Sequence, residues 1–282
     1  MNIKSNLKKI VCSVLALINI LFNLKGCSVV SNISIFKEKS LEITFMNIGK
    51  ADCILITAGD KAILIDTGLN STKDNVVSEL RKKGVCDLEC LILTHMDKDH
   101  IGGAPSILNN FNVKKVVQAD YKKDSKQYDK YVESLASNDI TPVLLHEEIS
   151  VDLKDVKINI YPALKKEYSK SNDYSIITEV LYGKYSFLFM GDAEEERLLE
   201  FMNMNNKDYD VVKIPHHGRE SSVSEEFIGS IKPSYAVITC SEEDSPDDSI
   251  MEILEKYDVK TFLTSNGDVV MTCDGNNINI VQ

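Results

Sequence analysis

The segment Leu91-Ile-Leu-Thr-His95-Met-Asp97-Lys-Asp99-His100-Ile-Gly102-Gly103 places two histidines and two aspartates directly after a short apolar run. Imidazole and carboxylate groups suit divalent cations, so this pattern predicts a metal site on the turn that follows a buried strand. An acidic loop without a metal is the alternative. Because two of the chain's five histidines lie within this one segment, the metal site is the favoured interpretation.

The composition is that of a soluble globular protein. The 282 residues suffice for one large domain or two small ones. Hydrophobic residues make up 43% of the chain and charged residues 27%, as in ordinary globular domains. The formal net charge is −11 and the pI is near 5.0, so the surface as a whole should repel nucleic acid. A polyanionic substrate would therefore need bound metal or a local basic patch.

Residues 1–27 predict a signal peptide or lipoprotein anchor, joined to the body by a polar linker at 28–40. Three lysines precede the apolar run 10–24, which suits a signal peptide and is short for a membrane span of about 20 residues. Leu24-Lys-Gly-Cys27 resembles a bacterial lipobox. Lipidation at Cys27, an uncleaved anchor and a cleaved secretory signal all remain open. Each places the body outside the cytoplasmic membrane of a bacterium, either anchored to it or secreted.

Residues 41–282 predict one α/β domain. Alternating runs at 41–46, 53–58 and 61–66, separated by turns, predict an antiparallel meander. Further strands are expected at 90–94, 113–119, 142–145, 156–161, 175–181, 185–190, 210–214, 235–239 and within 259–281. Helices are expected at 71–83, from about 101, at 121–138, 193–202 and 248–257, and after a second capping-box pattern at 222–225; the first such pattern opens the helix at 71. Strands followed by helices in each half predict a four-layer α/β/β/α sandwich.

Three further apolar strands end in residues suited to cation binding. Asp66 ends the first, where it could equally be a turn residue. Asp192 ends the second, where it could bridge two cations or cap the acidic helix that follows. Pro215-His216-His217-Gly218 ends the third, and since neighbours on a strand face opposite ways, one histidine would face a metal and the other substrate. The isolated His146 is expected at the surface.

Together these motifs resemble the metallo-β-lactamase superfamily over residues 41–275. The segment 95–100 is similar to its HxHxDH signature, with Asp97 at the second histidine. That variant, together with Asn172-Asp-Tyr-Ser175 and the His216-His217 pair, is similar to the hydrolase domain of ComEC-type DNA-uptake proteins. The resemblance implies a four-layer metallo-β-lactamase sandwich and a metallo-β-lactamase-like hydrolase domain at residues 41–282.

The resemblance also implies two divalent cations, Zn²⁺ or Mn²⁺, held by residues at the strand ends. The implied ligands are His95 and Asp97 for the first cation, Asp99, His100 and His217 for the second, and Asp192 between the two. Asp66 would orient a ligand histidine. The superfamily's middle histidine falls near 171–173, where Asn172 or Asp173 could substitute. The carboxylate of Asp97 would shift this less certain first site from Zn²⁺ toward Mn²⁺ or Mg²⁺.

The leading functional hypothesis is an extracytoplasmic metal-dependent hydrolase, a phosphodiesterase or nuclease, in which a metal-bridged hydroxide attacks phosphorus. Asp99 would be essential to cleavage, and His216 would contact substrate or protonate the leaving oxygen. DNA or another phosphodiester would be the substrate. Lysines within 114–130 could attract it, although a solvated helix face also explains them. No protein partner is expected.

Two alternatives remain open. One is hydrolysis of another ester or an amide, such as a cell-wall phosphocholine ester or a lactam. A zinc-dependent lactamase usually rests on a three-histidine site, which this sequence lacks. The other alternative is a non-catalytic metal-binding lipoprotein that keeps the fold.

Overall fold

A computed structural model describes residues 40–282 of the chain. The signal or anchor predicted at 1–27 and all but the last residue of the predicted linker lie outside the described residues. Within residues 40–282, none of the helices combines the length and the apolar character that a membrane crossing requires.

Eight strands form the first sheet, in the order β17-β16-β1-β2-β3-β5-β7-β8. Their bounds are β1 (Leu41–Phe45), β2 (Ile54–Ala58), β3 (Lys61–Ile65), β5 (Cys90–Leu93), β7 (Val116–Ala119), β8 (Val143–Leu145), β16 (Val269–Cys273) and β17 (Ile278–Val281). The first three pair antiparallel, as the meander predicted. From β3 to β8 the pairing is parallel. Parallel strands covered on both faces need apolar side chains throughout, and all four residues of β5 are buried.

Seven strands form the second sheet, in the order β15-β14-β13-β12-β11-β10-β9. Their bounds are β9 (Ile149–Leu153), β10 (Val156–Tyr161), β11 (Ile177–Tyr182), β12 (Tyr185–Phe189), β13 (Val211–Lys213), β14 (Tyr235–Ile238) and β15 (Lys260–Leu263). The strands predicted at 175–181 and 185–190 pair as the hairpin β11–β12. Strand β9 was not predicted, because its exposed positions weaken the apolar pattern.

The predicted split of the sheets between two halves of the chain is partly wrong. The strand at 156–161 already belongs to the second sheet, while the last hairpin, β16–β17, returns to the first and pairs with β1. Local patterns reveal a strand but not its partner, because pairing depends on contacts between distant residues.

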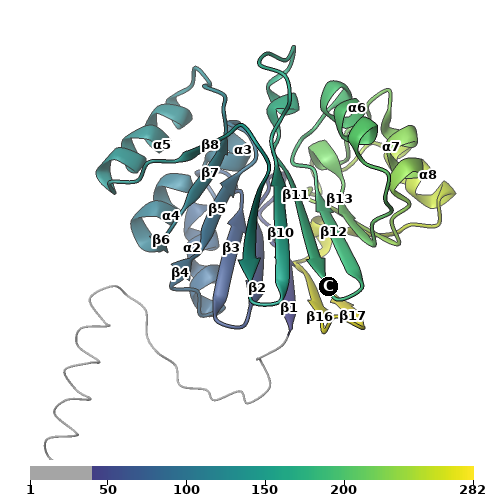
Figure 1. The fold of residues 1–282 in the computed structure, drawn as a ribbon, viewed down its shortest axis with the longest axis horizontal. Helices are drawn as coiled ribbons and strands as arrows, with labels where there is room; N and C mark the ends of the chain where they lie inside the picture. Colours follow the sequence, from purple (N-terminus) through teal and green to yellow (C-terminus); the bar gives the residue numbers. More distant parts are fainter. Residues whose placement is uncertain (1–39) are drawn as a thin grey trace, which may run out of the picture.

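Helices cover the outer face of each sheet, which gives the predicted four layers (Figure 1). On the first sheet lie α2 (Lys73–Lys82), α4 (Ala104–Asn110) and α5 (Lys126–Ser137), and on the second lie α6 (Glu195–Met204), α7 (Ser224–Ile231) and α8 (Asp248–Lys256). Between the sheets the rings of Phe45 and Phe189 stack, with centroids 5.9 Å apart. The two short strands β4 (Asp87–Leu88) and β6 (Asn112–Val113) pair separately, so the strand predicted at 113–119 is split in two.

Neither predicted capping box forms. The N-cap of α2 is Thr72, whose hydroxyl donates to the carbonyl oxygen of Leu69, 3.1 Å away, instead of accepting from the helix. Helix α7 begins after Val223, and no side chain caps it. Both helices are held instead by their buried apolar faces, which pack on the sheets.

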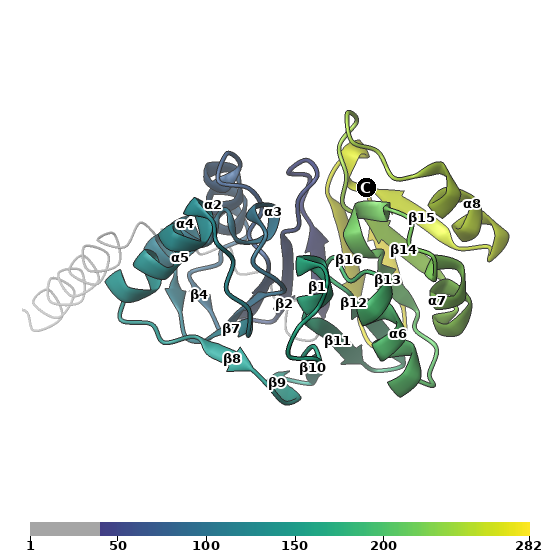
Figure 2. The ribbon, with the colours of Figure 1, turned by 90° about the horizontal axis from the view of Figure 1, so that it is seen from above.

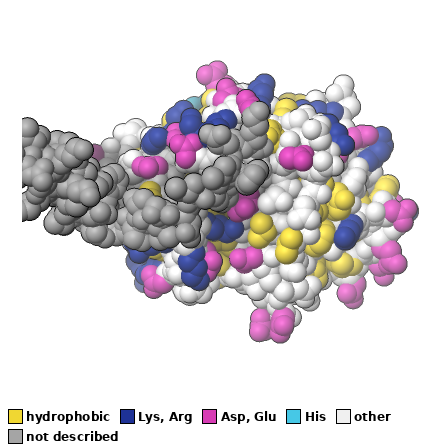
Figure 3. Space-filling view, turned by 90° about the horizontal axis from the view of Figure 1, so that it is seen from below, with side chains coloured by type: hydrophobic (Ala, Val, Ile, Leu, Met, Phe, Trp, Pro, Cys, Tyr) yellow, Lys and Arg dark blue, Asp and Glu magenta, His cyan; other side chains and the backbone are white. Residues whose placement is uncertain are grey.

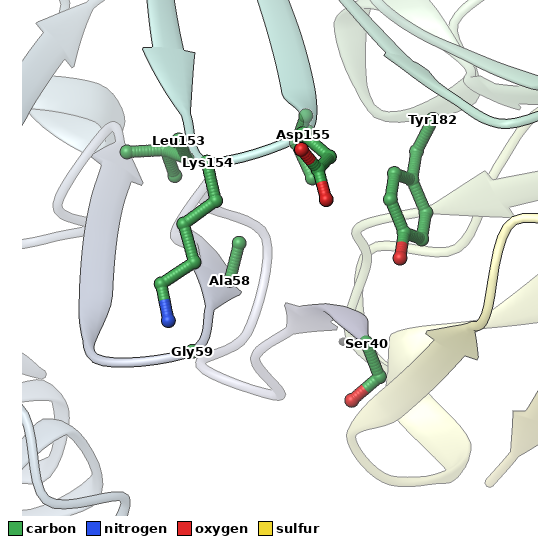
Figure 4. Close-up of a pocket in the computed structure, with 8 residues that line it drawn as sticks. Ser40, Ala58, Gly59, Leu153, Lys154, Asp155 and Tyr182 are labelled. Atoms are coloured by element: carbon green, nitrogen blue, oxygen red, sulfur yellow. The ribbon is translucent and has the colours of Figure 1, made fainter. Parts of the chain in front are cut away.

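Within residues 40–282, neither group of converging metal-binding side chains lies at the lower end of the sandwich in Figure 1. Among the described residues, the side chains visible there mix both signs of charge with apolar groups (Figure 3). A hollow at this end lies between the β2–β3 turn and the β9–β10 turn (Figure 4); it is lined by Ser40, Ala58, Gly59, Leu153, Lys154, Asp155, Val156 and Tyr182. The candidate metal-binding residues lie at the other end of the sandwich.

Candidate metal centre

The strand ends singled out in the sequence meet at one edge of the sandwich, between the two sheets. Figure 2 looks onto this end of the molecule. Asp66 follows β3, the 95–100 segment follows β5, Asp192 follows β12, and His217 lies just beyond β13. Carboxyl ends of parallel strands share an edge, which explains why residues so distant in sequence converge. Within residues 40–282, ligand atoms of one such group all lie within 4.8 Å of one another: Asp99, His100, Asp192 and His217.

Two glycines allow the turn after β5 to pack against the turn after β3. A Cβ atom on Gly103 would lie 2.3 Å from the carbonyl oxygen of Thr67, and one on Gly102 would meet backbone atoms at similar distances. The close approach lets the Thr67 amide donate to the carbonyl oxygen of His100 at 2.8 Å. The glycines at 102 and 103 thus hold the short helix α3 (Lys98–Ile101), and with it His100, beside Asp66.

Asp66 orients the ring of His100, as the resemblance implied. Its Oδ2 lies 2.8 Å from Nδ1 of His100, and its Oδ1 accepts from the amide of Thr94 at 2.8 Å. Both residues are fully buried. A carboxylate accepts, so Nδ1 of His100 carries the hydrogen and Nε2 turns its lone pair toward the cluster.

His217 is oriented in the same way by the second sheet. Its Nδ1 lies 2.8 Å from the carbonyl oxygen of Thr239. A carbonyl oxygen can only accept, so this nitrogen carries the hydrogen and Nε2 again faces the cluster. Nε2 lies 3.3 Å from Oδ2 of Asp192 and 3.6 Å from Oδ2 of Asp99.

The inward-facing nitrogens of three imidazoles lack hydrogen-bond partners. Nε2 of His95, His100 and His217 are all buried, and none makes a hydrogen bond of good geometry within the described residues, although Nε2 of His100 and His217 lie 3.1 and 3.3 Å from Oδ2 of Asp192. Leaving such a group unsatisfied costs about 1–3 kcal/mol, so native proteins rarely do it. A divalent cation between Asp99, His100, Asp192 and His217 would accept the lone pairs of His100 and His217. The donor set of two imidazoles and two carboxylates therefore fits a metal ion.

The electrostatics of the cluster also favour a cation. Burial lowers the pKa of His217, but the carboxylates of Asp192 and Asp99 outweigh burial and raise it to about 9. Burial raises the pKa of Asp192, but His217, His100 and Lys213 hold it well below its usual value. The aspartates are thus ionised, and their negative charge favours a positive charge at His217, either as a proton or as a bound cation.

A buried lysine that was not predicted as a site residue, Lys213, contacts Asp192. Nζ of Lys213 lies 2.5 Å from Oδ2 of Asp52 and 3.4 Å from Oδ1 of Asp192, and it donates to the carbonyl oxygen of Gly191 at 2.9 Å. Burial raises the pKa of Asp52, but Lys213 and the nearby histidines hold it below its usual value. A lysine inside the apolar strand Val211–Lys213 was the available signal, because a charge buried there needs a partner.

Asp192 does not cap α6, which begins at Glu195. Oδ1 of Asp173 takes that role and accepts from the amides of Glu194 and Arg197 at 2.9 and 3.1 Å. The capping alternative for Asp192 is therefore wrong, and its carboxylate faces the cluster. Asp173 was one of the two proposed substitutes for the middle histidine, but these hydrogen bonds direct its Oδ1 to the start of α6.

His216 points away from His217, although not by strand alternation. Strand β13 ends at Lys213, and both histidines lie in a single turn, Pro215–Gly218, with left-handed φ values of 49° and 53°. The His216 side chain remains 29% exposed. Its Nε2 lies 3.3 Å from Nδ2 of Asn172, and that amide also donates to Glu194 at 2.9 Å.

His95 and Asp97 form the less complete half of the centre. Nε2 of His95 lies 3.9 Å from Oδ1 of Asp97, and burial, together with the neighbouring His100, lowers the pKa of His95 to about 4. Neither residue belongs to a group of three or more converging ligand atoms in the described part of the chain. The ammonium of Lys123 contacts the same Asp97 oxygen. Elsewhere His146 is exposed, as predicted.

The sequence profile of the metallo-beta-lactamase superfamily matches residues 47–241. The chain is 24% identical over 251 residues to ComE operon protein 3 of Bacillus subtilis, covering 81% of this chain and 32% of that protein. It is 29% identical over 237 residues to recombination protein 2 of Haemophilus influenzae, covering 80% and 28%. The chain thus spans about a third of the length of these curated relatives.

Among solved structures, the metallo-beta-lactamase fold protein YhfI from Bacillus subtilis superposes with a TM-score of 0.57 at 9% identity, covering 86% of this chain and all of that one. This similarity confirms the predicted fold, and the similarity to ComE operon protein 3 confirms the predicted resemblance to ComEC-type proteins. The matched profile spans well over half of the chain and includes every residue of the converging cluster. The chain belongs to the metallo-beta-lactamase superfamily.

Proposed function

We propose that this protein is a metal-dependent hydrolase of phosphodiesters, with DNA as its substrate. One observation carries the proposal: Asp99, His100, Asp192 and His217 converge within 4.8 Å, and both imidazoles turn an unpaired Nε2 toward the carboxylates. The name of one relative, recombination protein 2, supports DNA over other phosphodiesters.

In this proposal Asp99, His100, Asp192 and His217 hold one cation. Asp66 and Thr239 fix the two ring orientations, and Lys213 fixes Asp192. A divalent cation bound there would polarise a phosphoryl oxygen and neutralise charge that develops on it. Asp99 is essential in this proposal because it is a cation ligand and, as the most exposed of the four residues, it borders the space open to substrate.

His216 is the proposed proton donor to the leaving oxygen. Its partly exposed ring borders the cluster, and Asn172 and Glu194 flank its two nitrogens. General acids work best when such neighbours fix the ring in one orientation. His216→Gln should therefore lower the turnover number for substrates with poor leaving groups more than for p-nitrophenyl esters, whose leaving group needs no proton.

We also propose that residues 41–282 act outside the cytoplasmic membrane. The basic and apolar pattern of residues 1–27 supports this location, as does the lipobox-like Leu24–Cys27 segment. Fractionation of cells that produce the full chain, with and without Cys27→Ala, tests the anchor. Release of the variant from the membrane would support lipidation, and a cytoplasmic full-length chain would refute the proposed location.

The activity is tested with purified protein on single-stranded DNA, RNA, bis-p-nitrophenyl phosphate and a chromogenic lactam, each with Mn²⁺ and Zn²⁺. Asp99→Ala and His217→Ala should each lose at least about 100-fold in phosphodiester cleavage, since each removes a cation ligand. Asp155→Ala and His146→Ala are matched controls at exposed positions outside the converging group and should keep it. Cleavage of the lactam alone, or full activity in either site variant, would refute the proposal.

A further inference from the structure

We propose that the ammonium of Lys123 takes the place of the first cation, so that the centre holds one divalent ion and one lysine. This inference rests on the proposed metal centre, whose tight site is formed by Asp99, His100, Asp192 and His217. It concerns the other half, formed by His95 and Asp97. It assigns to Lys123 a role in determining how many cations the protein binds.

The first argument is the number of ligands. Groups of at least three converging ligand atoms occur twice within residues 40–282, and neither group includes His95 or Asp97. A stable site for Zn²⁺ or Mn²⁺ needs about four donors, some of which can be water. The pair His95 and Asp97, 3.9 Å apart, offers two and could at most share Asp192 with the neighbouring site. Such a site would be weak before any competitor is considered.

The second argument is where Lys123 lies. It belongs to the loop between β7 and α5, and its Nζ contacts Oδ1 of Asp97, the same oxygen that faces His95. Nζ also donates to the hydroxyl of Ser171 at 3.4 Å. The ammonium is thus held between the carboxylate of Asp97 and the short helix Ser171–Tyr174, which lies in the connection between β10 and β11.

The third argument is that this loop is fixed at both ends. Tyr121 stacks on Tyr174 with ring centroids 4.2 Å apart, which ties the loop to the short helix Ser171–Tyr174 that precedes β11. At the other end, Nε2 of Gln127 donates to the carbonyl oxygen of Gly102, 3.0 Å away, which ties the start of α5 to the metal-binding turn. Lys123 lies between these two anchors. Its contact with Asp97 is therefore a built feature of the fold and not the chance position of a surface side chain.

The consequence is electrostatic. A fixed ammonium next to Asp97 repels a divalent cation and occupies the carboxylate that would bind it, so a second cation should bind at least about tenfold more weakly than it would without Lys123. The ammonium in turn supplies positive charge beside the bound cation. Because its side chain remains 29% exposed, it can contact an anionic substrate directly.

The test counts metal ions, which makes it independent of catalysis. Protein stripped with chelator is titrated with Mn²⁺ and Zn²⁺, and bound metal is measured by calorimetry and elemental analysis. The wild type should bind one ion per chain tightly. Lys123→Met, which keeps the length of the side chain and removes its charge, should bind a second ion at least about tenfold more tightly than the wild type does. Lys123→Arg should behave like the wild type.

His95→Ala separates the two halves. Alone, His95→Ala should leave the single tight ion of the wild type in place. Combined with Lys123→Met, it should abolish binding of the second ion. Thermal unfolding of each variant checks that the fold is intact. Two tight ions in the wild type, or no gain in a folded Lys123→Met, would overturn the inference. If one ion binds as expected but no phosphodiester is cleaved, the proposed function fails and this inference stands.

Discussion

Replacing Lys213 with methionine should destabilise the protein strongly, because it leaves two buried carboxylates without their positive partner. Nζ of Lys213 lies 2.5 Å from Asp52 and 3.4 Å from Asp192, and all three side chains are at most 4% exposed. Removing one partner of a buried ion pair costs about 3–5 kcal/mol. In a domain of this size each kcal/mol corresponds to roughly 2–4 °C, so the melting temperature should fall by roughly 6–20 °C.

The assay is urea and thermal unfolding followed by circular dichroism, in the presence of EDTA so that no cation replaces the lost charge. Adding Asp52→Asn to Lys213→Met removes one of the two unpaired buried charges, so the double variant should be more stable than the single Lys213→Met variant. Lys232→Met is the matched control. Its partner Asp208 lies 3.2 Å away and both side chains are more than 60% exposed, so it should change stability by less than about 0.5 kcal/mol.

Two results would refute this reasoning about the buried pair. One is a loss below about 1 kcal/mol in Lys213→Met, which would mean that the ammonium does not neutralise the two aspartates. The other is strict additivity between the changes at positions 213 and 52, since interacting charges must couple.

Three further predictions address other contacts. Asp66→Asn should weaken Mn²⁺ binding by about 10- to 100-fold in a calorimetric titration, because it releases the ring of His100, and unchanged affinity would refute that role. Gly103→Ala should cost about 1–3 kcal/mol in urea unfolding, since its Cβ would lie 2.3 Å from the carbonyl oxygen of Thr67. Burial raises the pKa of Glu179, but hydrogen bonds from neighbouring lysine, asparagine and tyrosine side chains hold it below its usual 4.5. The stability from this lowered pKa is present above the usual value and is lost as the pH falls through the lower one. Glu179→Gln should therefore cost about 1.5–3 kcal/mol at pH 7 and less at pH 3, and an equal cost at both would contradict it.

The position of the centre was predictable from the sequence because local patterns encode it. Asp66, His100, Asp192 and His217 each follow an apolar run, and parallel strands bring such ends to one edge. The four layers followed from the same alternation of strands and helices. The pair His216-His217 was expected at the end of a strand with alternating side chains, but both residues lie in a left-handed turn beyond β13.

The lysines around the centre could not be read in the same way. Lys213 is one charge in an apolar strand, and its partner Asp52 lies far away in the sequence. Lys123 was grouped with the lysines of a predicted helix, yet it precedes α5 and turns toward Asp97. Pairing of distant strands was equally invisible, as the return of β16–β17 to the first sheet demonstrates. These features depend on contacts that only the folded chain creates.

The most direct test of the proposed centre measures metal and hydrolysis in the same samples. Chelator-treated protein is titrated with Mn²⁺, bound metal is followed by electron paramagnetic resonance, and bis-p-nitrophenyl phosphate hydrolysis is recorded at each point. Hydrolysis should rise in proportion to bound Mn²⁺ in the wild type and in His146→Ala, while His217→Ala should lose both. Hydrolysis by metal-free protein, or undiminished hydrolysis by His217→Ala, would contradict the assignment of this cluster as the catalytic metal centre.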